Sequence, residues 1–388
     1  MNKLRIGVIG LGDICDVYLK TLLANSDKVS VAACASHGLE KAQRAASQYG
    51  IPKAYESAEQ LIADPEIDML LNLTPPAVHG KYNLMALRAG KHVYTEKPLA
   101  ATFAEGREIM KLAAEKGLTV GCAPDTFLGG RIQTIRDLID NGTIGAVTGA
   151  TGFVAYFGVE SFHPNPAAFY QPGAGPLFDI GPYYMTALLS LLGPVRRCCA
   201  MSKRTFDTRM ITSEPRRGEV IPVSVDTYTT GILEFASGAL ATLLFSFDVR
   251  DSELPRMEIY GTKGTLCVPD IDPLDGPNLF GGELWLRTAE TYRWNTLPRD
   301  AETAASPWEK VPVTRPYTST SHEENSRGIG LLDAVDAIQE HRKPRASGEM
   351  ALHSLEVMES MLISAQESRF CEMETTFERP EPLPNPLA

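Results

Sequence analysis

The sequence predicts an α/β protein of two domains, the first built on a doubly wound parallel sheet. Short apolar runs alternate with helical stretches as far as residue 122, the pattern of consecutive βαβ units. A glycine-rich turn separates the first predicted strand from the first predicted helix. Beyond residue 122 the alternation gives way to β-type segments separated by glycine and proline. We therefore expect a doubly wound domain over residues 1–124, followed by an α/β domain with a large open, mostly antiparallel sheet over residues 125–388.

The first domain is expected to contain five strands joined by helices. Strands are predicted at Leu4–Ile9, Val29–Ala35, 69–73, 92–94 and 119–122. Helices are predicted near 13–24, Leu39–Tyr49, 78–89 and Phe103–Lys116, where apolar residues recur at helical spacing. Strands and helices that alternate in this way form a parallel sheet covered by helices.

The second domain opens with a predicted helix near Gly130–Asp140. Its predicted strands cover 149–156, 195–204, 225–235, 238–248, 256–260 and Gly264–Val268. Two helices, near 324–340 and 349–367, close the chain, and Lys343-Pro344 breaks the backbone between them. The proline-rich tail that follows Arg379 is expected to be an extended arm, either docked or frayed.

Composition and charge narrow the functional class. The net charge of −11 and the pI near 5.2 give no general attraction to nucleic acid or to anionic membranes. The seven cysteines contain no CxxC pair, so we expect reduced thiols. We find neither a secretory signal pattern nor an apolar run long enough to span a membrane. We therefore expect a cytoplasmic protein that binds neither nucleic acid nor membranes.

The turn Gly10-Leu11-Gly12 has the sequence context of a dinucleotide site. Gly10 permits a tight turn, and Gly12 lets a pyrophosphate approach the backbone. The following helix, which begins near Asp13 and Ile14, offers unpaired N–H groups and the positive end of its dipole. Cys15 replaces the usual third glycine, and a generic turn between a strand and a helix is the alternative interpretation.

The end of the second strand bears on which dinucleotide binds. An NAD site usually presents Asp or Glu to the ribose hydroxyls at this point, whereas this chain has Ser36 and His37. Without a carboxylate, a 2′-phosphate is not repelled, and both side chains can hydrogen-bond to it. The sequence therefore favours NADP over NAD.

Two further motifs follow later strands and occur together with the glycine turn. The first is Thr74-Pro75-Pro76 with His79, and the second is Thr95-Glu96-Lys97-Pro98. With Gly175-Pro-Leu-Phe-Asp179-Ile-Gly-Pro-Tyr183, they give a pattern that resembles the Gfo/Idh/MocA family, which includes glucose–fructose oxidoreductase and inositol dehydrogenase. The resemblance covers nearly the whole chain.

The resemblance implies a Rossmann domain, a second domain whose open sheet faces substrate on one side and often a partner subunit on the other, and an active site between the domains. It implies that Lys97 contacts both the nicotinamide ribose and the substrate, and that the peptide before Pro98 is often cis. The alternative is a surface lysine beside a helix start. The predicted cofactor-binding residues are Gly10, Gly12, Asp13, Ile14, Ser36, His37, Thr74, Pro75, His79, Glu96 and Lys97.

Tyr183 occupies the position where the family commonly has histidine. This substitution resembles the branch in which tyrosine serves as the acid/base and NADP is common. A free phenol holds its proton too tightly to act as a base near neutral pH, but a neighbouring ammonium such as Lys97 favours the phenolate. Asp179 is expected to orient Lys97 or a substrate hydroxyl, or else to cap the next helix. Tyr184 is the alternative to Tyr183.

Other substrate contacts are less defined by the sequence. His163 is a candidate contact to a sugar hydroxyl, the alternative being a loop histidine held by its own turn, and Asp125 is a second candidate. His322 and Arg327 precede the closing helices, but no pattern indicates where they point. We find no metal-binding spacing and no Gly-x-Ser-x-Gly elbow, so neither a metal nor a serine nucleophile is expected.

The expected function is NAD(P)-dependent hydride transfer to or from a secondary alcohol or ketone of a sugar, glycoside or cyclitol. Two alternatives share the architecture: a glycosidase that acts by transient oxidation and elimination, and a regulatory protein that senses dinucleotide. The presence of both Lys97 and Tyr183 argues against the regulatory protein. The open sheet favours a homodimer or homotetramer.

Overall fold

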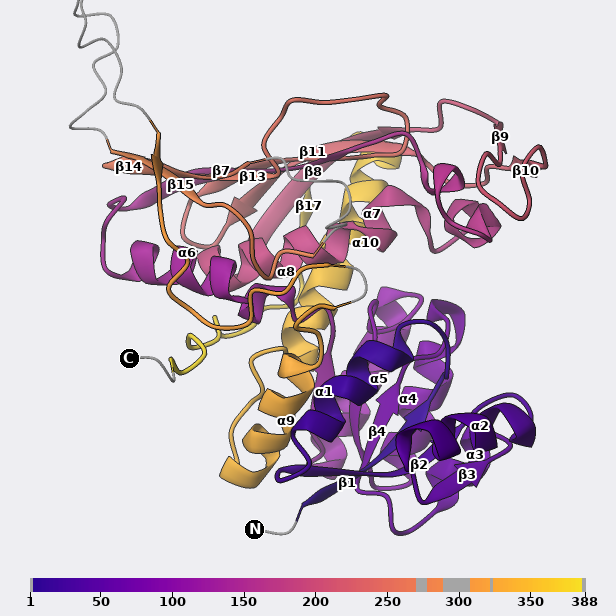
Figure 1. Cartoon of the computed structure of the whole chain (residues 1–388). Helices are drawn as coiled ribbons and strands as arrows, with labels where there is room; N and C mark the ends of the chain where they lie inside the picture. Colours follow the sequence, from indigo (N-terminus) through magenta and orange to yellow (C-terminus); the bar gives the residue numbers. More distant parts are fainter. Residues whose placement is uncertain (1–2, 270–277, 289–307, 322–323, 386–388) are drawn as a thin grey trace, which may run out of the picture. The chain divides into compact units, whose positions relative to one another are not determined.

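The parallel sheet predicted for the first domain is present in the computed structural model, which describes residues 3–269, 278–288, 308–321 and 324–385 (Figure 1). Six strands lie in the order β3-β2-β1-β4-β5-β6, and every neighbouring pair is parallel. They are β1 (Leu4–Ile9), β2 (Val29–Ala35), β3 (Lys53–Tyr55), β4 (Met69–Asn72), β5 (His92–Thr95) and β6 (Val120–Cys122). The order reverses between β1 and β4, where doubly wound sheets bind their ligands.

Five helices connect these strands. They are α1 (Cys15–Ala24), α2 (Leu39–Tyr49), α3 (Ala58–Ala63), α4 (His79–Arg88) and α5 (Phe103–Lys116). The chain winds outward from β1 in one direction through β2 and in the other through β4 and β5. Because parallel crossovers are right-handed, α1 and α2 cover one face of the sheet, and α4 and α5 cover the other.

The division of the chain differs from a single cut after residue 124. One unit contains residues 1–128 and 323–356, and the other contains residues 129–322 and 357–388. The returning segment carries α9 (Ile329–Glu340) and the first part of α10 (Gly348–Glu367). It is fixed to β6 because Cys122 N–H donates to the Ala346 carbonyl and Gly121 bridges Ser347. This pairing links positions far apart in the sequence.

The second unit is built on a nine-stranded mixed sheet in the order β16-β15-β14-β13-β7-β12-β11-β8-β17. The strands are β7 (Val147–Ala155), β8 (Val195–Lys203), β11 (Tyr228–Phe235), β12 (Leu240–Ser246), β13 (Met257–Gly261), β14 (Gly264–Val268), β15 (Trp285–Thr288), β16 (Glu309–Lys310) and β17 (Cys371–Glu372). Only the β12–β7 pairing among them is parallel. The predicted large, mostly antiparallel sheet is therefore confirmed.

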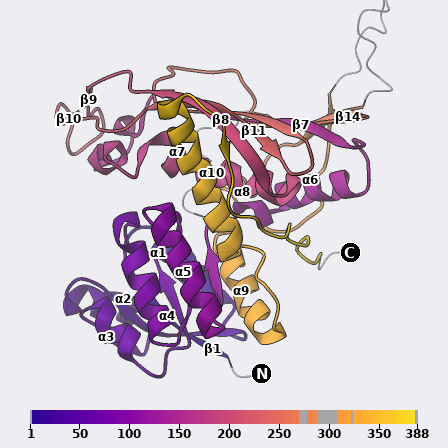
Figure 2. The same ribbon diagram turned by 180° about the vertical axis from the view of Figure 1, so that it is seen from behind.

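Helices cover one face of this sheet and leave the other face without a helix among the described residues (Figures 1 and 2). The covering helices are α6 (Gly130–Asp140), α7 (Gly175–Asp179), α8 (Gly181–Leu192) and the second part of α10. The described residues also form short 3-10 turns at Pro76–Val78, Thr126–Leu128, Val159–Ser161 and Pro166–Tyr170. Leu233 and Phe235 of β11 point into the covered side and are fully buried, whereas Ile232, which comes directly before Leu233, is exposed. The period of two is that of a sheet with one buried face.

A separate two-stranded hairpin, β9 (Thr208–Met210) with β10 (Val220–Pro222), extends from the loop after β8. The tail, as far as residue 385, is docked rather than frayed. Arg136 of α6 donates to the Pro380 carbonyl at 2.7 Å, and Leu383 N–H donates to the Gln133 side chain at 2.7 Å.

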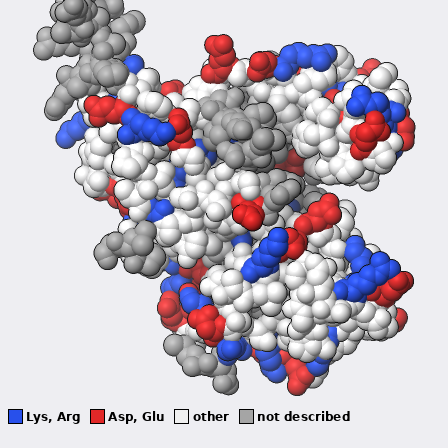
Figure 3. Space-filling view, viewed as in Figure 1, with Lys and Arg blue, Asp and Glu red and all other residues white. Residues whose placement is uncertain are grey.

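The bulk expectations can be compared with the described residues. None of the seven cysteines forms a disulfide, and no described helix is long and apolar enough to cross a membrane. Basic and acidic side chains are interspersed on the face shown in Figure 3, without a continuous basic patch. Two of the basic side chains form ion pairs with neighbouring carboxylates, Arg197 with Glu234 and Arg216 with Glu219.

Candidate active site

Four predicted site segments begin at one edge of the parallel sheet. Ile9 at the end of β1 pairs with Ala35 at the end of β2 and with Asn72 at the end of β4. Asn72 in turn pairs with Thr95 at the end of β5. The turns that follow these four strands carry the glycine motif, the Ser36 segment, the Thr74 segment and the Lys97 segment. The sheet register therefore brings the cofactor candidates together, as the fold class predicts.

The glycine turn has the geometry of a dinucleotide cradle. Gly10 has φ 87°, and a Cβ there would lie 2.4 Å from the Leu73 backbone, so only glycine lets β1 and β4 end this close together. A Cβ added at Gly12 would meet no described atom within 4 Å, which leaves space beside the turn. The N-cap of α1 is Ile14, whose side chain cannot cap the helix, so its first N–H groups suit a pyrophosphate.

Cys15 packs in place of the missing third glycine. Its side chain is buried at the start of α1, and burial raises the pKa of the Cys15 thiol to about 12. The thiol therefore stays protonated and serves as a small packing group between helix and sheet. The departure from the glycine pattern leaves the cradle intact.

Ser36 and His37 lie at the end of β2 and are partly and largely exposed, respectively. The nearest carboxylate that follows them in the chain, Glu40, forms an ion pair with Arg44 on α2. The backbone between strand and helix passes through Gly38 at φ 91°. Nothing in this turn places a carboxylate where β2 ends.

The turn after β4 is held by buried side chains. Thr74 donates from its N–H and its hydroxyl to Asn72 Oδ1, at 3.2 and 2.6 Å. His79 is fully buried, with Nδ1 2.7 Å from the Pro98 carbonyl oxygen and Nε2 2.6 Å from the Thr74 carbonyl oxygen. Burial lowers the pKa of His79, and its contacts with the two carbonyls oppose that shift. Both ring nitrogens are engaged by the protein, which differs from the direct cofactor contact predicted for His79.

The Lys97 turn is held from the other side through Glu96. The Tyr18 hydroxyl donates to Glu96 Oε1 at 2.8 Å, and Arg327 Nη1 lies 3.8 Å from the same oxygen. Lys97 N–H donates to Glu96 Oε2 at 3.0 Å. The peptide between Lys97 and Pro98 is cis, as the family resemblance implies. The buried carboxylate of Glu96 thus holds this turn in place. Arg327 lies beside the same carboxylate, a contact that no sequence pattern predicted.

Asp125, a predicted substrate contact, is bound by backbone groups of its own unit. Its side chain is fully buried, and Oδ2 accepts N–H bonds from Gly328 at 2.8 Å and Gly330 at 2.9 Å. It therefore binds the backbone at the N-terminus of α9 instead of lining a surface. Burial raises the pKa of Asp125 to about 6. Its partners lie about two hundred positions away in the chain, and no sequence pattern predicts this contact.

In the second unit, both tyrosine candidates lie in the first turn of α8, directly after the α7–α8 junction. Asp179 ends α7, one residue before Ile180, the N-cap of α8, and Pro182 and Tyr183 follow in the first turn of α8. The Tyr184 ring packs on the sheet, 6.1 Å from the Phe245 ring of β12. Both tyrosines are buried, and Tyr183 remains the predicted acid/base.

His163 lies in the loop between the 3-10 turns at Val159–Ser161 and Pro166–Tyr170. Its Nδ1 accepts the Asn165 N–H at 3.0 Å, and its ring packs edge-on against Phe169 at 4.8 Å. Ser213 donates to its carbonyl oxygen at 2.6 Å. The turn thus holds the imidazole, and Nε2 is the ring nitrogen that suits a substrate hydroxyl. His322 lies outside the described residues.

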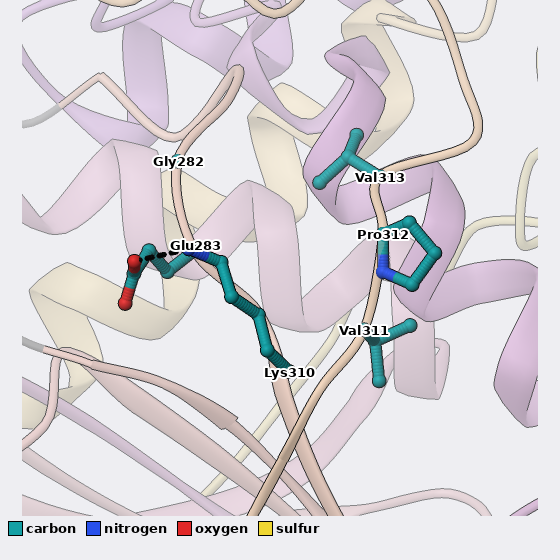
Figure 4. Close-up of a pocket in the computed structure, with 6 residues that line it drawn as sticks. All are labelled: Gly282, Glu283, Lys310, Val311, Pro312 and Val313. Atoms are coloured by element: carbon teal, nitrogen blue, oxygen red, sulfur yellow. Dashed lines mark hydrogen bonds and ion pairs between the residues drawn. The ribbon is translucent and has the colours of Figure 1, made fainter.

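Two other features of the described residues bear on the chemistry, a groove and the grouping of metal-ligating side chains. An open groove of about 440 Å³ is lined by Gly282, Glu283, Lys310, Val311, Pro312 and Val313. Figure 4 shows Glu283 and Lys310 meeting in an ion pair of 2.5 Å on one side, across from the Val–Pro–Val segment. Because this pair is mutually satisfied, we assign the groove no reaction. The described residues contain no cluster of three metal-ligating side chains.

The sheet order and the glycine cradle define a Rossmann-type dinucleotide-binding protein with a second α/β domain. Residues 4–123 match the family model described as oxidoreductase family, NAD-binding Rossmann fold, and residues 132–267 match the GFO/IDH/MocA C-terminal domain. The chain belongs to the Gfo/Idh/MocA oxidoreductase family. The predicted family and the predicted NAD(P)-binding enzyme class are thereby confirmed.

The similarity to known proteins extends over much of the chain. D-glucoside 3-dehydrogenase of Escherichia coli is 27% identical over 268 residues, which cover 68% of this chain and 76% of the relative. The 1,5-anhydro-D-fructose reductase of Ensifer adhaerens is 26% identical over 375 residues, covering 96% and 99% of the two chains. The structure of levoglucosan dehydrogenase with NADH has a TM-score of 0.79 at 20% identity, with 96% of this chain and 100% of that chain covered. That structural likeness supports the fold.

Proposed function

We propose that the chain transfers a hydride between NADP(H) and a secondary alcohol or ketone carbon of a sugar, glycoside or cyclitol. The observation that carries the proposal is the sheet register, which starts the glycine turn and the Lys97 turn at the same edge of one parallel sheet. The names of the two curated relatives both refer to redox chemistry on a sugar derivative, which supports this substrate class.

The proposed roles follow from the chemistry of each side chain. When bound, the nicotinamide accepts or returns a hydride at its C4. In the oxidative direction, the substrate C–H bond breaks with its electron pair while Tyr183 takes the hydroxyl proton and the C=O bond forms. The Lys97 ammonium stabilises charge on the substrate oxygen, Asp179 orients the reacting groups, and His163 contacts a more distant hydroxyl. Reduction reverses each step.

We propose NADP as the preferred cofactor because the turn after β2 presents Ser36 and His37 in place of a carboxylate. A fluorescence titration should therefore give a lower Kd for NADPH than for NADH. NADH bound at least about tenfold tighter, a difference of about 1.4 kcal/mol, would reverse the assignment.

The function is tested by mixing the purified protein with NADP+ or NADPH and a panel of polyols, glycosides and keto sugars, and following nicotinamide absorbance. Lys97→Met and Tyr183→Phe should each lower kcat by roughly 100-fold or more. Tyr184→Phe keeps the packed ring and should retain wild-type kcat. Bound cofactor with no absorbance change across the panel would contradict the proposal. Aglycone release without net NADPH would indicate redox-assisted glycoside cleavage instead.

We further propose that the face of the nine-stranded sheet without a helix binds a second copy of the chain. Met201 on β8, Ile232 on β11 and Leu240 on β12 are 76%, 47% and 52% exposed. Apolar side chains on adjacent strands form a patch that a two-fold partner can cover.

We also propose a cytoplasmic location. None of the seven cysteines forms a disulfide, which supports a reducing compartment.

A further inference from the structure

One face of α4 binds the backbone of the Lys97 turn. His79 and Asn83 are four residues apart on this helix, so their side chains lie one above the other. Both are fully buried. His79 Nδ1 lies 2.7 Å from the Pro98 carbonyl oxygen, and Asn83 Nδ2 donates to the Leu99 carbonyl oxygen at 3.1 Å. Two successive carbonyls that follow Lys97 are therefore held by a single helix face.

The same imidazole reaches the turn after β4. Its Nε2 lies 2.6 Å from the Thr74 carbonyl oxygen, and Thr74 is also tied to Asn72 Oδ1. Asn72 Nδ2 donates to Asn83 Oδ1 at 2.8 Å, which closes the network. Buried amide and imidazole groups that bind only backbone and one another serve to fix loop geometry. His79 is the member that contacts both turns directly.

We propose that His79 is a positioning residue that couples the Thr74 turn to the Lys97 turn. Through Nδ1 it sets the direction of the Lys97 backbone, and through Nε2 it sets the turn proposed to lie against the cofactor. The inference rests on the proposed function of Lys97. An imidazole with two protons donates to both carbonyls, and a neutral one donates to one of them. Holding both turns at once therefore requires the ring with two protons.

Three substitutions separate the two nitrogens. The amide nitrogen of His79→Asn lies near the position of Nδ1 and retains the contact with Pro98. The longer His79→Gln places its amide nitrogen near Nε2 and retains the contact with Thr74. His79→Leu fills similar volume without either donor. A thermal unfolding scan first establishes that each variant folds, and the two amide variants keep the inference testable where the leucine variant does not fold.

The readouts are the Kd for NADPH, kcat on the best substrate of the panel, and the rate at which acetic anhydride labels Lys97, measured by peptide mass spectrometry. We expect His79→Asn to keep the labelling rate and kcat near wild type but to raise the Kd for NADPH roughly tenfold. His79→Gln should do the reverse, with kcat lowered roughly 10- to 100-fold and labelling of Lys97 changed several-fold. Exposed Lys81 on the same helix is the internal control.

Identical effects of the two amide variants, or a leucine variant with wild-type labelling, Kd and kcat, would overturn the inference. Acylation of Lys97 by acetic anhydride needs no catalysis by the protein, so the labelling rate can be measured whether or not the proposed function holds. An active Lys97→Met variant would contradict the proposed function. An inactive Lys97→Met variant together with an unaffected His79→Gln variant would contradict only the positioning role of His79.

Discussion

Asp125 shows at the residue scale how a buried carboxylate affects stability. Its Oδ2 accepts two backbone N–H groups, and Arg327 favours the charged form, but desolvation is the larger effect and raises the pKa of Asp125 from 3.8 to about 6. The folded chain therefore keeps this proton up to a higher pH than the unfolded chain. As the pH rises from about 4 to about 6, the folded state loses stability relative to the unfolded state.

We predict that Asp125→Asn removes this pH dependence. The asparagine oxygen can still accept the two N–H bonds, and no buried charge forms. The difference between a pKa of 3.8 and one of about 6 corresponds to about 3 kcal/mol. The free energy of unfolding of the variant should therefore exceed that of the wild type by up to about 3 kcal/mol above pH 6 and equal it below pH 4. Urea unfolding across this range measures the difference. A variant clearly less stable at neutral pH would contradict the prediction.

Asp64→Asn is the control of opposite sign. Its carboxylate accepts from Lys53 at 2.9 Å, and this bond lowers the pKa of Asp64 to about 2. The stabilisation it provides is present above the unfolded pKa and is lost as the pH falls toward 2. The asparagine variant should therefore lose stability at neutral pH, where Asp125→Asn does not.

At the residue scale, the sequence predicted the turns better than the partners of individual side chains. Gly10, Gly12 and Lys97 lie at the edge that their motifs predict, because a motif fixes local backbone geometry. Asp125 and His79 were predicted to contact ligands, and in the structure their side chains contact backbone groups. Their partners come from other segments, and a single sequence carries no signal for such pairings.

At the element scale, the hairpin β9–β10 depends on one buried arginine. Arg209 Nη1 lies 3.0 Å from Glu160 Oε1, and Nη2 donates to the Phe247 carbonyl at 2.7 Å and to the Asp248 carboxylate. The side chains of all three charged residues are only 4% exposed. Because Glu160 precedes the His163 loop, this cluster also anchors the loop with the candidate substrate contact.

We predict that Arg209→Met lowers the free energy of unfolding by about 3–5 kcal/mol, because it leaves two buried carboxylates without their cation. Arg216→Met, which removes an exposed pair with Glu219, should change it by less than about 1 kcal/mol. Chemical denaturation of both variants provides the comparison. Equal effects of the two substitutions would show that the buried cluster does not stabilise the hairpin.

Long periodic elements were predictable, and short or uniformly apolar ones were not. Helices α2 and α5 end where their patterns end, whereas β3, β9 and β10 contain three residues each and give no measurable period. Helix α8 was expected only as the helix that follows Asp179, and its bounds were not predicted, for a different reason. Every one of its residues is buried, so no polar face marks a helical repeat.

At the scale of the whole molecule, the sheet face without a helix allows a prediction about assembly. If a second copy covers Met201 and Ile232, the double substitution Met201→Glu with Ile232→Glu should shift the dimer or tetramer to monomer, because it buries carboxylates at the interface. Light scattering coupled to size exclusion measures the mass. Thr208→Glu, at an exposed position on the hairpin, is the matched control. A monomeric wild type, or an unchanged mass in the double variant, would contradict the proposal.

The return of residues 323–356 to the dinucleotide-binding unit limits how this protein can be cut or recombined. The Thr21 hydroxyl of α1 donates to the Arg327 carbonyl at 2.7 Å, and the Asp125 carboxylate needs Gly328 and Gly330. A fragment that stopped at residue 128 would leave β6 without its contacts to Ala346 and Ser347, and would leave the Asp125 carboxylate without the two N–H groups that donate to it. A chimaera that exchanges cofactor preference between relatives must therefore carry both pieces, with its second junction inside α10 near residue 356.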